Sequence, residues 1–112
     1  MLNQGIITGR LTKDVELKKV NDRSVVSFTL ASSRDYKTEE GAYPADFIDC
    51  VLWGAPAESF HTLTAKGDTL QVTGRLQTRT YKDKKEVTHK VTEVQVDKWY
   101  IVAVNQNQGD YP

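Results

Sequence analysis

The chain has 112 residues, a formal net charge of zero at neutral pH and 38% hydrophobic residues. This length allows one domain with a single core, and no apolar run approaches the roughly 20 residues that cross a bilayer. The first residues lack the basic and apolar regions of a signal peptide. Cys50 is the single cysteine, which excludes an intrachain disulfide. We therefore expect a cytoplasmic protein without a membrane partner.

The charges are unevenly distributed along the chain. Residues 75–90 hold six basic and two acidic residues, a net charge of +4, whereas residues 35–49 hold one basic and five acidic residues, a net charge of −4. A net charge of zero argues against a general affinity for nucleic acid, but a local positive field is enough to guide a polyanion. An ordinary salt-bridged surface is the alternative interpretation.

Alternating apolar and polar residues predict five strands. They are expected at residues 6–11, 25–31, 45–53, 69–81 and 87–96, the last one extended by residues 99–104. Asn21 and Asp22 form a turn signal, and Gly9 and Gly74 mark bends or bulges inside two of the strands.

The remaining segments are expected to be loops and one helix. Residues 33–44 form a long polar loop, and residues 82–86 a charged hairpin tip. Pro56 suits the first turn of a short helix, with Gly67 as its terminator. The order predicts an all-β, five-stranded Greek-key barrel of the oligonucleotide/oligosaccharide-binding (OB) type, with the helix between strands 3 and 4. We expect this domain to span residues 1–104, followed by a short polar tail at 105–112.

Four aromatic residues lie beside basic residues or in polar stretches, namely Tyr36, Phe47, Trp53 and Tyr81. Phe47 and Trp53 are six residues apart, so they share one face of a regular strand, with Ile48, Cys50 and Leu52 on the other. Exposed rings next to cations suit unpaired bases, because a base stacks on the ring while the cation meets the phosphate; each stack contributes roughly 1–3 kcal/mol. The alternative for each ring is packing in the core or in a hairpin.

Phosphate contacts are assigned to nine basic residues. The first candidates are Arg10, Arg34, Arg75 and Arg79, and the next are Lys13, Lys37, Lys82, Lys84 and Lys85. A solvated surface charge is the alternative for each of them.

Four segments carry a resemblance to a known family. They are GRLTKDVEL at residues 9–17, ADFIDCVLWGAPAE at 45–58, VTGRLQTRTY at 72–81 and VTEVQVD at 91–97. Together they resemble the bacterial and bacteriophage single-stranded DNA-binding protein family over residues 1 to about 104. The resemblance implies base stacking on the four aromatic residues and coating of single strands in replication, recombination or repair.

The resemblance also implies partners. It predicts a homo-oligomer, with a tetramer expected. The residues themselves indicate the contact segments: the first strand, residues 2–11, is apolar on both faces, and residues 99–102 offer more apolar surface than one small barrel leaves exposed. Longer family members recruit replication and repair proteins through an acidic tail that ends in phenylalanine. The sequence here ends in Gly-Asp-Tyr-Pro and has no such acidic run.

Other functions find less support in the residues. His61 and His89 are far apart and there is one cysteine, so neither a metal site nor a cofactor is expected. The chain has no G-x-x-x-x-G-K phosphate loop and no G-x-S-x-G elbow, and an enzyme is not expected. A protein-interaction module with weak or lost DNA binding remains an alternative. A cold-shock type of RNA-binding barrel is another, although its Lys-Gly-Phe-Gly-Phe-like strand is missing.

Overall fold

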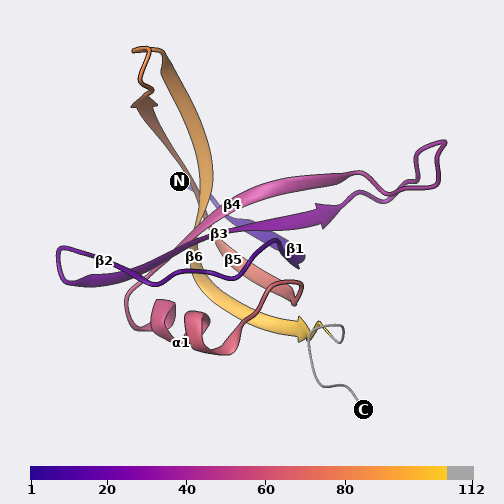
Figure 1. Cartoon of the computed structure of the whole chain (residues 1–112), viewed down its shortest axis with the longest axis horizontal. Helices are drawn as coiled ribbons and strands as arrows, with labels where there is room; N and C mark the ends of the chain where they lie inside the picture. Colours follow the sequence, from indigo (N-terminus) through magenta and orange to yellow (C-terminus); the bar gives the residue numbers. More distant parts are fainter. Residues whose placement is uncertain (106–112) are drawn as a thin grey trace.

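The computed structural model of the chain describes residues 1–105. The elements are β1 (Gly5–Leu11), β2 (Lys18–Val20), β3 (Arg23–Ser33), β4 (Ala45–Trp53), α1 (Ala55–Leu63), β5 (Thr69–Lys82) and β6 (Thr88–Ala103) (Figure 1). All six strands form one sheet in the order β1-β5-β6-β4-β3-β2, and a further pairing of β1 with β3 closes it into a barrel. The expected all-β barrel with one short helix before the long hairpin is confirmed, and it is an OB-fold.

Two glycines allow close approaches between strands where the barrel bends. At Gly9, a Cβ atom would lie 2.8 Å from the carbonyl oxygen of Ala31, where β1 crosses onto β3. Of the two features expected at Gly9, a bend or a bulge, the structure has no bulge, since β1 keeps one register against β5 through Arg10. At Gly74 the register against β6 does shift, and a Cβ atom there would collide with the carbonyl oxygen of Gln95. A side chain at either position would force the strands apart.

The core fills the barrel, and α1 covers one end of it. Its fully buried large side chains are Leu11, Val26, Leu30, Cys50, Leu52, Phe60, Leu70, Val72 and Val94. Phe60 of α1 stacks on Phe28 at 4.3 Å between ring centroids, and Trp99 meets Phe60 edge-on at 5.0 Å. The helix ends at Leu63, four residues before the expected terminator Gly67. These ring contacts fix the helix against the barrel.

β2 is a strand that the sequence pattern did not predict. It is three residues long and exposed, so it shows no apolar alternation. Asn21 and Asp22, with φ angles of 51° and 65°, form the expected turn as a two-residue hairpin loop. This turn pairs Val20 with Arg23, so that β2 forms a short hairpin with the first residues of β3.

Two hairpins extend from the barrel as separate arms (Figure 1). The β3–β4 arm comprises residues 31–47 with its connecting loop, and the β5–β6 arm comprises residues 77–93. β4 and β6 pair in parallel only at Cys50↔Val94 and Val51↔Gln95, and beyond these pairs the arms diverge. β6 is one strand, not two pieces, because the shift near Asp97 is absorbed without breaking it.

The end of the described chain is held to the domain. The backbone N–H of Asn105, expected as the first tail residue, donates to the buried carboxylate of Asp68, and its side-chain amide donates to the carbonyl of Lys66. The rest of the predicted tail, residues 106–112, lies outside the described residues.

Candidate nucleic-acid interface

The strand register places three of the four predicted stacking rings on the outer face of the sheet. Cα partners in neighbouring strands share a face, and successive residues alternate between faces. On β4, the side chains of Phe47 and Trp53 share one face, and the buried side chains of Cys50 and Leu52 lie on the other face, as the spacing predicted. Tyr81 lies on the same outer face, because it is an even number of residues from Arg75, whose partner Gln95 pairs with Val51 of β4.

Phe47 is the most open of the rings. Its side chain is 68% exposed. Its Cα partner Ala31 pairs in turn with Arg10 of β1, so Arg10 and Phe47 share one row across three strands. A base stacked on Phe47 would have the Arg10 guanidinium within reach of its phosphate.

Trp53 is half-buried, and a cation covers its ring. The guanidinium carbon of Arg23 lies 4.9 Å from the indole centroid, a cation–π contact. Lys18 pairs with Val25, which pairs with Trp53, so a second cation lies in the same row. Sequence reasoning missed both cations. The turn at Asn21 and Asp22 was the sequence signal that could have placed them, because a two-residue hairpin loop fixes which residues pair across it.

Tyr81 lies within a group of side chains on the β5–β6 arm. Its ring stacks on His89 at 5.1 Å between centroids with an interplanar angle of 21°, and the guanidinium carbon of Arg79 lies 5.8 Å from its centroid. Arg79 is held by Glu93, whose Oε1 accepts from its Nε at 3.2 Å. With 46% of its surface exposed, Tyr81 keeps room for a base beside these neighbours.

The tip of the β5–β6 arm is organised by one carboxylate. Asp83 Oδ1 accepts from the backbone N–H groups of Lys85 and Val87, and its Oδ2 lies 2.8 Å from His89 Nε2. The hydrogen bond from His89, supported by those from the backbone, lowers the pKa of Asp83 below its ordinary value. The three lysines of this tip are exposed, namely Lys82, Lys84 and Lys85.

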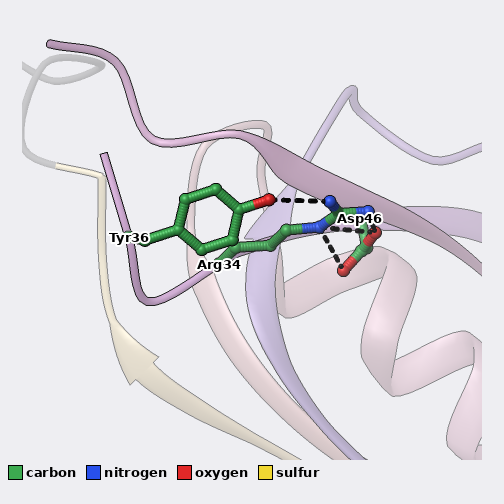
Figure 2. Close-up of polar contacts among 3 residues, drawn as sticks. All are labelled: Arg34, Tyr36 and Asp46. Atoms are coloured by element: carbon green, nitrogen blue, oxygen red, sulfur yellow. Dashed lines mark hydrogen bonds and ion pairs between the residues drawn. The ribbon is translucent and has the colours of Figure 1, made fainter. Parts of the chain in front are cut away.

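Tyr36 is at the end of the β3–β4 arm and is 55% exposed. Arg34 donates from Nη1 to the Tyr36 hydroxyl at 3.0 Å, and from Nη2 and Nε to the Asp46 carboxylate at 2.8 and 3.2 Å (Figure 2). These bonds lower the pKa of Asp46 and raise that of Arg34. Arg34 was expected as a phosphate ligand, and the structure gives it protein partners.

The remaining candidate cations are spread along the outer surface. Lys13 and Ser27 line two adjoining hollows over β3, one reaching Lys18 and the other Arg79. Lys37 lies in the β3–β4 loop with its Nζ 5.4 Å from the ring centroid of Tyr43, an exposed aromatic residue that sequence reasoning did not select. The hollows connect the cations near Trp53 to those near Tyr81.

Carboxylates also lie on the outer face. Asp49, between the two β4 rings, accepts a hydrogen bond from the Thr29 hydroxyl at 2.9 Å. Cys50 lies next to it on the opposite, buried face; burial, followed by the nearby charges of Asp49 and Glu93, raises the pKa of its thiol to about 12. These acids limit the positive charge of the face, so the rings have more weight in any binding there.

Two observations concern other kinds of site. Over residues 1–105, no three His, Cys, Asp or Glu side chains gather in a group that could hold a metal ion. The one helix of this part of the chain is too short to cross a membrane.

An OB barrel with exposed rings and cations on one face belongs to the class of oligonucleotide-binding barrels. The chain belongs to the single-strand binding protein family, whose model matches residues 2–102. It is 39% identical over 111 residues to "Single-stranded DNA-binding protein 1" of Streptococcus pyogenes serotype M18, covering 98% of this chain and 85% of that protein. It is 41% identical over 103 residues to the "Single-stranded DNA-binding protein" of Lactiplantibacillus plantarum, covering 91% of this chain and 52% of that protein.

Proposed function

We propose that this chain is a sequence-nonspecific single-stranded DNA-binding protein that coats and protects exposed strands in replication, recombination or repair. The observation that carries the proposal is the outer face, where Phe47, Trp53 and Tyr81 lie on one continuous surface with basic residues in the same rows. Membership of the family supports it, because the relatives carry single-stranded DNA binding in their names.

The proposed mechanism combines stacking with phosphate neutralisation. Bases stack on the exposed rings, and every base has a π-face, which makes the binding tolerant of sequence. Arg10 beside Phe47, Arg79 beside Tyr81 and Arg75 in the row between the arms take phosphates, together with the lysines of the β5–β6 tip. Duplex DNA is excluded because its bases are already stacked and paired. No step in this mechanism makes or breaks a covalent bond, so we propose a binding protein and not an enzyme.

We also propose a homo-oligomer, with a tetramer as the expected state. Among the described strands, β3 pairs with β1 only at Arg10 and Leu11, which leaves the preceding edge of β1 open to a copy of itself. Ile6 on β1 and Tyr100 and Val102 on β6 are exposed apolar residues that such an interface would cover. Linked barrels bind one strand more tightly, because each later contact is intramolecular.

The setting follows from the same family membership. We propose a cytoplasmic location in a bacterial cell or a phage-infected bacterial host, with replication or recombination proteins as further partners.

A fluorescence titration tests the binding function. Oligothymidines of increasing length are added to the protein at two salt concentrations, with matched duplex DNA and matched RNA as competitors. Trp53 is expected to be quenched by a stacked base, whereas Trp99 packs against Phe60 and is expected to respond little. Unchanged emission together with no binding by an independent assay would support the protein-interaction module instead. Preference for RNA would support the cold-shock type of barrel.

A further inference from the structure

The polar cluster at the end of the β3–β4 arm joins three side chains that sequence reasoning had assigned separately or not at all. Arg34, Tyr36 and Asp46 are each about half exposed, and Arg34 connects the other two (Figure 2). We call these three residues the Arg34 clasp. The inference below rests on the proposed DNA-binding function.

The Arg34 guanidinium is already occupied by protein groups. Its Nε and Nη2 hold the two oxygens of Asp46, with distances of 2.8 to 3.3 Å, in the two-pronged geometry that a planar guanidinium forms with a carboxylate. Its Nη1 donates to the Tyr36 hydroxyl. The charges of Arg34 and Asp46 cancel, so the pair offers a phosphate little net attraction.

The clasp lies on the opposite side of the arm from Phe47. Asp46 directly precedes Phe47 on β4, and adjacent residues of a strand point to opposite faces. The Cα partner of Asp46 is Ser32, whereas that of Phe47 is Ala31. The Tyr36 hydroxyl is therefore fixed toward the Asp46 side of a two-stranded ribbon.

We propose that Arg34 is a positioning residue, which with Asp46 fixes the Tyr36 ring for base stacking on the face of the β3–β4 arm opposite Phe47, and that it is not a phosphate ligand. A bound strand then reaches both rings by passing over the edge of this arm. That edge is open, because beyond Phe47 the arm pairs with no third strand among the described residues.

The two roles of Arg34 predict opposite results for Asp46→Asn. If Arg34 bound phosphate, removing its carboxylate partner would free the cation and strengthen DNA binding. If Arg34 positions Tyr36, the same change loosens the ring and weakens binding. Glu40→Gln is the matched control, because it removes one carboxylate from the same arm without touching the clasp, so it reports the purely electrostatic gain.

The experiment titrates oligothymidine into the wild type and variants, with thermal melting to confirm that each variant folds. We expect Asp46→Asn and Arg34→Lys to weaken binding about two- to ten-fold, as for the loss of one exposed two-pronged ion pair. Tyr36→Phe keeps the ring but removes the hydroxyl, and should weaken binding by a similar factor. Glu40→Gln should bind as well as the wild type or more tightly.

A double-mutant cycle and the salt dependence complete the test. In a Tyr36→Ala background, Asp46→Asn should no longer weaken binding and should change it only by the electrostatic gain that Glu40→Gln shows, because there is no ring left to position. The slope of log K on log salt should be unchanged in Arg34→Lys and Arg34→Ala. Tighter binding by Asp46→Asn, or a slope reduced by about 0.7 in Arg34→Ala, would overturn the proposal and return Arg34 to the phosphate ligands.

Failure of this inference can be told apart from failure of the proposed function. If the wild type binds and Trp53→Ala weakens it while the clasp variants bind normally, only the positioning role is overturned. If the wild type itself does not bind oligothymidine, both are overturned.

Discussion

Arg23 lies over the indole ring of Trp53, with its guanidinium carbon 4.9 Å from the ring centroid. The contact joins the start of β3 to the end of β4, so the β2–β3 hairpin brings its charge to the interface. Arg23→Ala should therefore weaken oligothymidine binding, about two- to ten-fold for a cation–π and phosphate contact of this kind. Lys19→Ala is the control, because Lys19 belongs to the same hairpin but pairs with the buried Ser24 on the other face. If the two changes weakened binding equally, Arg23 would contribute only its positive charge and no specific contact at Trp53.

Trp53→Ala should weaken single-strand binding far more than it lowers the free energy of unfolding. The expected loss is roughly 1–3 kcal/mol of binding, the range for one stacked base. Trp99→Ala should show the reverse, because Trp99 packs against Phe60. Binding by fluorescence anisotropy with a labelled oligothymidine and unfolding by urea measure the two quantities. A Trp53→Ala protein that binds normally but unfolds much earlier would make Trp53 a core residue.

Affinity should fall with salt at a moderate slope. If about four cations meet phosphates per barrel, the slope of log K on log salt is roughly −3, from about −0.7 per contact on single strands. The carboxylates Asp49 and Glu93 on the outer face keep the number of effective cations low. A slope near zero would remove Arg10, Arg75 and Arg79 from the phosphate role, and a much steeper one would indicate several subunits on one strand.

The Cys50 thiol should be inert in the native protein. Its pKa of about 12 lies above the ordinary thiol value, so the folded state stays protonated while the unfolded state ionises from about pH 9 upward. This residue's contribution to stability is complete below pH 9 and is lost as the pH rises toward 12. The free energy of unfolding of the wild type should fall more steeply above pH 9 than that of Cys50→Ala. Rapid labelling of the native protein by a thiol reagent at pH 8 would contradict the burial of this group.

The protein should be larger than its 12.6 kDa monomer in solution. Light scattering across a dilution series from micromolar concentration upward measures the mass, and Ile6→Lys, which charges the open edge region of β1, should lower it. Ser59→Lys is the control, because it adds the same charge at an exposed position of α1, a helix that packs against β3 and β4. A single monomeric species at all concentrations would leave the exposed residues Ile6, Tyr100 and Val102 without the proposed partner.

Much of the fold was predictable because period-two alternation is strong in the strands that form the core. The bounds of β4 were predicted to the residue, since Ile48, Cys50 and Leu52 alternate with outward side chains. β2 was not predictable in this way, because three exposed residues carry no burial signal. The extension of the last strand through residues 99–104 was predicted, and β6 runs to Ala103. The register shift near Asp97 that joins the two parts was not predictable, because it depends on the pairing with β5.

The interface was predictable in its rings and less so in its cations. Phe47 and Trp53 were identified because they alternate along the strand with the apolar residues that form the buried face. The partner of a cation depends on contacts across strands, so the Arg34–Asp46 pair and the position of Arg23 over Trp53 required the register. A turn of two residues fixes that register, and the turn at Asn21 and Asp22 was visible in the sequence.

The parallel contact between β4 and β6 has a mechanical consequence. Its two Cα pairs, Cys50↔Val94 and Val51↔Gln95, lie at the base of both arms, the point from which the β3–β4 arm and the β5–β6 arm diverge. Tyr81 lies five residues beyond Leu76, the β5 partner of Val94, which corresponds to about 16 Å along an extended strand. A tilt of the β5–β6 arm by about 5° at this pairing point would therefore move the Tyr81 ring by about 1 Å. Phe47 belongs to the β3–β4 arm. We therefore expect the spacing between these two rings to depend on the angle between the two arms, so that a change in this angle would adjust the rings to DNA bases that are unevenly spaced.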